Sequence, residues 1–80
     1  MALKKEVICD RVEVLERGQV QVRMATVITD GGAEVSRTFQ RHVLEPGADT
    51  TNETARVRSI ADATWTPQVV SDWNDFLAAR

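Results

Sequence analysis

The chain has 80 residues, 42% of them apolar and 28% charged, and a formal net charge of −2 from ten Lys and Arg against twelve Asp and Glu. This length suits one domain over residues 1–80, with a globular rather than a disordered composition. No apolar run approaches the roughly 20 residues of a transmembrane helix, and Met1–Lys5 lacks the apolar stretch of a secretory signal. The only cysteine, Cys9, excludes an internal disulfide and fits a reducing compartment or a particle assembled in one.

Charge is spread unevenly along the chain. Residues 1–44 carry seven basic and six acidic groups, whereas residues 45–80 carry three basic and six acidic groups. A surface that binds nucleic acid needs clustered Lys and Arg, and the sequence has no such cluster. The distribution therefore argues against nucleic acid as a partner, and the missing apolar span argues against a membrane.

An α+β fold is predicted, with a three-stranded antiparallel β-meander followed by two short C-terminal helices packed on one face. Eleven valines and eight threonines bias the chain toward strands, which we place at about 5–15, 19–29 and 33–43. Apolar residues alternate along the second of these, which is the period of a strand with one buried face.

The turn between the second and third strands predicts their register. Gly31-Gly32 can adopt the positive φ angles of a two-residue hairpin loop. Such a loop places Ile28 opposite Val35 and Met24 opposite Phe39, so that the apolar positions of the two strands coincide.

The first strand is apolar on both faces, so its own pattern does not show which face is buried. The length of the loop that follows it sets the register and therefore the buried face. A three-residue loop at residues 16–18 or 17–19 brings Val12 and Val14 beside the valines of the second strand. The first of these loops also leaves Gly18 at the left-handed position of a type I turn with a bulge. We choose a three-residue loop, because a one-residue error would turn the whole strand over.

One face of the sheet is then predicted to be buried. Its members are Ile8, Val12, Val14, Val20, Val22, Met24, Ile28, Val35, Phe39 and Val43. Arg37 and Arg41 share this parity and are expected at an edge, with their charged heads in water. Asp10, Thr26 and Arg37 line up on the same face in one register, which predicts a polar pair between Asp10 and Arg37.

A turn-rich connection over 44–50 ends the predicted sheet. Thr50 followed by Glu53 matches a capping box, which predicts a helix over about 51–64. Apolar residues recur along this segment at helical spacing, giving it a single apolar stripe.

A second helix is predicted over 67–79. Thr66 is a good N-cap, and Pro67 falls at the first helical position, where its missing N–H costs nothing. Trp65 and Trp73 both lie in this helical layer, and we expect them to supply apolar mass to the core.

The sequence contains no catalytic or metal-binding constellation. His42 falls on the solvent side of the third strand, where Ser36 or Thr38 shares its face without any recognisable nucleophile motif. One cysteine and one histidine cannot form a zinc cluster, and Asp49–Glu53 lacks the ligand pattern of a calcium loop. We therefore predict a protein that is not an enzyme and has no cofactor and no metal.

The feature of this sequence that indicates a function is a surface able to contact another protein. A three-stranded meander has two free edges, and helices on one side leave the other face open to a partner. So small a core also gains from sharing surface, which favours a homo-oligomer or a larger assembly. The candidate interaction residues are Val7, Cys9, Leu15 and Val27 of the open face, together with Arg41 and His42.

Two segments, Arg41–Thr50 and Trp65–Val70, carry a resemblance. Over roughly residues 20–75 the chain resembles a family of small proteins encoded by tailed bacteriophages and prophages, often among their tail genes. The resemblance implies a structural or assembly role in the virion, which forms in the bacterial cytoplasm, and contacts with other phage structural proteins or with itself. The family brings no catalytic residues to carry over.

A second hypothesis of a different class stays open. The chain is then a small soluble phage-encoded regulator or inhibitor that binds one host protein. Its binding surface is the acidic helical layer formed by Glu53, Asp62, Asp72 and Asp75. Mass spectrometry of purified virions separates the two hypotheses.

Overall fold

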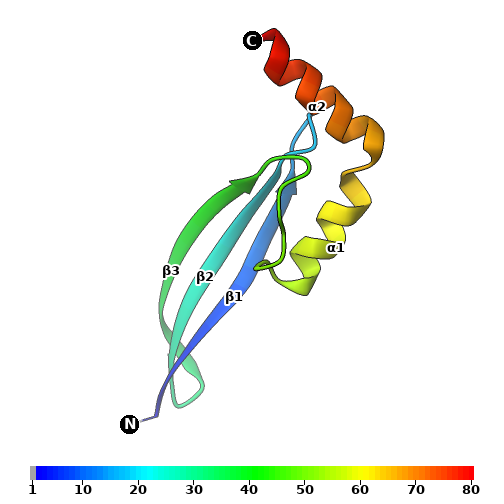
Figure 1. Ribbon diagram of the computed structural model, residues 1–80. Coiled ribbons are helices and arrows are strands. Elements are labelled where there is room, and N and C mark those ends of the chain that lie inside the picture. Colours follow the sequence, from blue (N-terminus) through cyan, green and yellow to red (C-terminus); the bar gives the residue numbers. More distant parts are fainter. Residues whose placement is uncertain (1) are drawn as a thin grey trace.

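The computed structural model describes residues 2–80 and has the predicted α+β topology. Three antiparallel strands form one sheet in the order β1-β2-β3, and two helices follow (Figure 1). The bounds are β1 Leu3–Val14, β2 Val20–Asp30, β3 Ala33–Leu44, α1 Ala55–Thr64 and α2 Pro67–Ala79. The meander and the two C-terminal helices are confirmed.

Both hairpin loops have the predicted lengths. The Leu15 N–H donates to the Gln19 carbonyl at 2.8 Å, which closes a three-residue loop with Gly18 at φ +90°. Gly31 and Gly32 have φ angles of +60° and +90°, the values of a type I′ turn between two strands. The positive φ angles of these glycines therefore permit the two tight turns that connect β1 to β2 and β2 to β3.

A β-bulge at Asp10 reverses the face of the first half of β1. Val12 pairs with Val22, as predicted, but the register shifts between Cys9 and Arg11, so that Cys9 pairs with Met24. Because paired residues share a face, Cys9 lies on the side of Val22, and the residue before it changes side as well. The prediction that Ile8 lies on the helix-covered face is therefore wrong.

A second bulge, at Val35, displaces β3 by one residue. Thr29 pairs with Glu34 and Ile28 pairs with Ser36, so Val35 has no partner in the ladder. From this point on the predicted pairs are wrong, and Met24 lies opposite Gln40 instead of Phe39. The predicted burial of Val35, Phe39 and Val43 is wrong for the same reason, since all three are exposed. The predicted burial of Val14 is also wrong, since it is 52% exposed although it pairs with Val20.

We call the side of the sheet that carries Val20 and Val22 the covered face, because α1 lies over it. Both valines and Val57 of α1 have no exposed surface and form the centre of the core. Val12, Met24, Leu44 and Trp65 surround this centre, and Cys9 also packs against it. The opposite side, with Arg23 and Val27, is called the open face.

The first helix begins later than predicted. Thr54 is its N-cap and accepts a hydrogen bond from the Val57 N–H, so Thr50 and Glu53 do not form the expected capping box. Asp49 instead accepts hydrogen bonds from the backbone N–H and the hydroxyl of Thr51, which keeps this segment in a turn.

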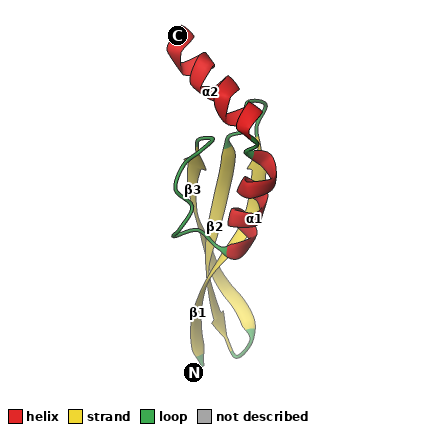
Figure 2. Cartoon of the chain, turned by 45° about the vertical axis from the view of Figure 1, so that its right-hand side comes forward, coloured by secondary structure: helices red, strands yellow, loops and turns green. Residues whose placement is uncertain are grey.

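The second helix begins as predicted and then leaves the sheet. Thr66 caps it by accepting from the Val69 N–H, and Pro67 occupies its first turn. Figures 1 and 2 show α2 continuing past the end of the sheet, beside the β1–β2 loop, while only α1 lies over the covered face. The molecule is consequently long and narrow, measuring 56 × 23 × 17 Å.

Candidate interaction surface

The exposed apolar side chains gather on the two edge strands. The sheet order leaves β1 and β3 each with one unpaired edge. Every residue of β3 from Ala33 to Val43 is exposed. Among residues 2–80 the large exposed apolar side chains are Leu3, Val7, Val14, Leu15, Val35, Phe39 and Val43. All of them belong to β1, to the residue that follows it, or to β3, and none belongs to a helix or to the central strand.

A bidentate ion pair crosses the open face. Arg23 donates to both carboxylate oxygens of Asp10, at 2.9 and 2.7 Å, and its guanidinium carbon lies 4.4 Å from the centre of the Phe39 ring. The bulge at Asp10 makes this pair, because it brings a second β1 side chain opposite Arg23. Two planar groups thus hold the guanidinium in place, one by hydrogen bonds and one by a cation–π contact.

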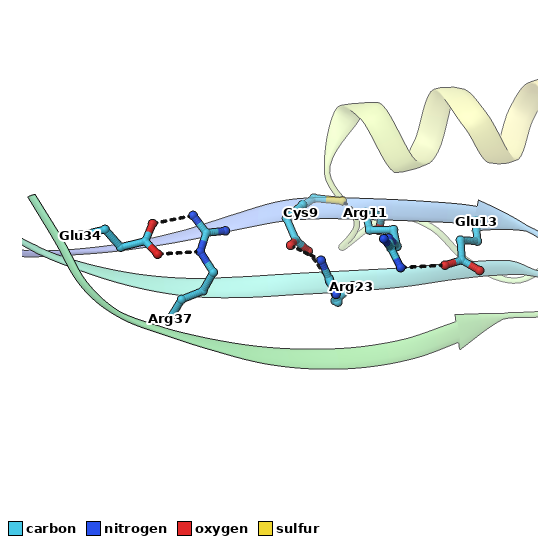
Figure 3. A network of polar contacts seen from close by, with 7 residues as sticks. Cys9, Arg11, Glu13, Arg23, Glu34 and Arg37 are labelled. Atoms are coloured by element: carbon cyan, nitrogen blue, oxygen red, sulfur yellow. Dashed lines mark hydrogen bonds and ion pairs between the residues drawn. The ribbon is translucent and has the colours of Figure 1, made fainter.

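The predicted pair between Asp10 and Arg37 is wrong. Arg37 donates to both carboxylate oxygens of Glu34, at 3.0 and 2.7 Å, on its own strand. Figure 3 shows this contact and the exposed pair Arg11–Glu13 along the same sheet. The open face therefore carries arginines that are paired with carboxylates, next to exposed apolar side chains.

The Arg23 hydrogen bonds hold the pKa of Asp10 below its ordinary value of 3.8. A carboxyl whose pKa falls on folding adds stability above the ordinary value, and that stability is lost as the pH drops through the lowered one. We expect Asp10→Asn to lower the urea midpoint near neutral pH, and the difference from the parent chain to shrink in strongly acidic buffer.

The matched control for this prediction is Glu13→Gln. Glu13 meets Arg11 at 3.5 Å with both side chains about half exposed, so we expect little change at either pH. A loss for Asp10→Asn that is as large in acid as at neutral pH would contradict the ion pair as its cause.

His42 is exposed, as predicted, but it lies on the covered face and not on the opposite side of the sheet. It pairs with Val22 across the sheet, and its Nε2 lies 2.9 Å from Glu53 Oε1 in the connection before α1. Ser36 and Thr38 do share its face, as their pairing with β2 shows. The neighbour of the imidazole is thus a carboxylate that anchors the connection to β3, and no hydroxyl donates to it.

A groove of about 420 Å³ lies between the β1–β2 loop and the helices, which also contact one another at its border. Trp65 Nε1 donates to the Gly18 carbonyl at 2.7 Å, and the Arg17 guanidinium lies 3.9 Å from the centre of the Phe76 ring. Trp73 is buried and stacks on Phe76 at 5.5 Å. The tryptophans therefore join the helices to the hairpin loop, and Trp65 also packs against the core.

The predicted interaction residues do not form one patch. Cys9 packs against the core on the covered face, and Val27 is buried on the open face. Val7 pairs with Thr26 on the side of Val22 and is 56% exposed, while Leu15 lines the groove at the other end of the sheet. Of this set, only Arg41 lies beside Phe39 on the open face.

The bulges explain which surface residues the sequence missed. The sequence predicts Phe39 and Val43 in the core only if β3 pairs with β2 without interruption from the Gly31-Gly32 turn onward. The available signal was the placing of Arg37 and Arg41 on the same parity, which is typical of a face that meets water. Reading that parity as exposed would have moved both apolar residues to the open face.

The acidic helical layer is partly engaged within the chain. Glu53 contacts His42, and Asp72 accepts from Gln68 at 2.7 Å. Asp62 and Asp75 are exposed on different helices. Two of the four carboxylates therefore have hydrogen-bond partners within the chain.

The described residues contain neither a metal-ligand cluster nor a helix that could span a membrane. Within residues 2–80 no three His, Cys, Asp or Glu side chains are grouped so as to hold a metal ion. No helix in this range has the length and apolar character needed to cross a membrane. No protein-family model, no curated protein and no solved structure matches the chain.

Proposed function

We propose that this chain is a non-enzymatic structural or assembly protein of a tailed-phage virion, associated with the tail or its fibres. It acts through protein–protein contacts, with itself and with neighbouring virion proteins. The single observation that carries the proposal is an elongated subunit whose apolar side chains remain exposed along both sheet edges.

The shape of the chain supports a role inside an assembly. Its radius of gyration is 16.3 Å, whereas a compact chain of this length has about 11.6 Å. Its accessible surface is 5572 Å², against about 4,800 Å² for a typical folded monomer of this mass. The excess of roughly 750 Å² is close to the area that one partner buries in a standard protein interface, about 800 Å².

The small core gives a second, independent reason. Within residues 2–80, only Val20, Val22 and Val57 are large side chains that are fully shielded from solvent. The half of the sheet beyond α1 has no helix on either face (Figure 2). A second protein on the exposed edges would add the apolar burial that the chain alone lacks, since binding to the folded state stabilises it.

The phage context comes from the two segments that resemble tail-region proteins. Arg41–Thr50 spans the end of β3 and the start of the connection to α1, and Trp65–Val70 precedes and opens α2. They lie against one another, since a Cβ built on Gly47 would stand 3.5 Å from Val70 Cγ1. The resemblance therefore falls on one packed unit at the helical end of the molecule.

Mass spectrometry of virions tests the proposal. Particles of the phage or induced prophage that encodes the chain are purified through a density gradient, washed in high salt and compared with the lysate. We expect the chain in the particle at a fixed ratio to the tail proteins. Its presence in the lysate and absence from washed particles would contradict the proposal and favour the soluble regulator.

A further inference from the structure

We propose that the free edge of β3 pairs with β3 of a second copy, antiparallel, about a two-fold axis at Gln40. This inference rests on the proposed function, because it names one surface and one partner for the self-association. It commits to a second copy of this chain as the occupant of the edge. The reasons are the length of the regular strand, its charge pattern and the position of its exposed apolar residues.

The regular part of β3 is centred on Gln40. The bulge at Val35 interrupts the ladder, and from Ser36 to Leu44 the pairing with β2 is continuous. An antiparallel two-fold pair matches residues at equal distances from its centre. A centre at Gln40 therefore uses the whole regular segment, and its outermost pairs join Ser36 to Leu44 of the other copy.

The charges of β3 favour this centre over its neighbour. With the axis at Gln40, Arg37 lies opposite Val43 of the second copy and Phe39 lies opposite Arg41 of the second copy. With the axis at Phe39, each Arg37 would lie directly opposite an arginine at position 41, twice in the same interface. Like charges in directly opposed positions destabilise a strand pair.

The exposed aromatic ring of β3 gains the most from the pairing at Gln40. Phe39 is 43% exposed, with Arg23 of its own chain on one side of the ring. The second copy adds the guanidinium of Arg41 across the new strand pair, within reach of the aromatic ring. Val43 is covered in the same way by the aliphatic stem of Arg37.

The edge of β1 is less suited to the same pairing. The bulge at Asp10 interrupts β1 near its middle. Bulges are one of the features by which edge strands avoid pairing with other chains. In β3 the bulge lies close to the hairpin, which leaves a longer uninterrupted segment.

A cysteine at the axis tests the proposal. In a Cys9→Ala background, Gln40→Cys places a thiol opposite its own copy, at the Cα separation of about 4.5–5.5 Å that a disulfide accepts. Thr38→Cys is the matched control, since Thr38 is exposed on the same face of β3. Its copies would be offset by about 13 Å along the strand, which is too far for a disulfide.

Mild oxidation at micromolar protein, followed by a non-reducing gel, gives the readout. We expect most of the Gln40→Cys chain to run as a disulfide-linked dimer and the Thr38→Cys chain to stay monomeric. Equal cross-linking of the two variants, or none in Gln40→Cys, would overturn the pairing. Both outcomes leave the virion experiment unaffected, so failure of this inference and failure of the proposed function are distinguishable.

Discussion

Replacing Gly18 by alanine is expected to lower the free energy of unfolding by about 2–4 kcal/mol. Gly18 has φ +90°, a left-handed conformation that costs an L residue about 1–2 kcal/mol. A Cβ at this position would also stand 2.6 Å from Val69 Cγ1 in α2. The Val69 side chain or the helix itself would have to shift, beside the hydrogen bond from Trp65 to the Gly18 carbonyl.

Gly32→Ala is the control that separates the two causes. Gly32 also has φ +90°, but a Cβ there would meet no atom within 4 Å. We expect it to cost only the conformational penalty, about 1–2 kcal/mol. Urea unfolding followed by tryptophan fluorescence measures both variants, and equal losses would contradict the packing of α2 against the β1–β2 loop.

Val22→Ala is expected to lower the free energy of unfolding by about 2–3 kcal/mol, since it removes two buried methyl groups and leaves a cavity. Val22 has no exposed surface and lies at the centre of the sheet, between Val12 and His42. Val22 is one of three large side chains of residues 2–80 that are fully buried, so its truncation removes a substantial part of the core. Urea unfolding of the purified variant gives the value.

Val7→Ala provides the comparison within the same sheet. Val7 lies on the same side as Val22 but nearer the β2–β3 hairpin, opposite Thr26, and it is 56% exposed. We expect a loss below about 1 kcal/mol for it. A loss as large as that of Val22→Ala would mean that the bare half of the sheet contributes as much to stability as the half beneath the helix.

Local signals were enough to predict the topology. The alternation of β2, the Gly31-Gly32 turn and the Thr66-Pro67 cap each act within a few residues, and the structure contains all three. The start of α1 was wrong because Thr50 and Thr54 both offer a capping hydroxyl. Asp49 holds Thr51 in a turn and Glu53 contacts His42 on β3, so the chain becomes helical only after Thr54.

The positions of the bulges could not be predicted, because nothing local marks Asp10, and the parity of Arg37 and Arg41 indicates only that β3 shifts somewhere before them. Asp10 follows a stretch that is apolar on both faces, so neither register violates its pattern, and the pair with Arg23 that favours the bulge joins residues on different strands. Val35 continues the alternation of β3 on the sequence level. The sequence thus predicted free edges, but a shift of one residue decided that Phe39 belongs to the exposed surface and Cys9 to the core.

Light scattering on the unmodified chain, measured over a dilution series from micromolar protein downward, tests the claim of self-association most directly. The exposed edges predict a mass of two or more 80-residue chains at the highest concentration, falling toward that of one chain on dilution. The mass of a single chain at every concentration would contradict it.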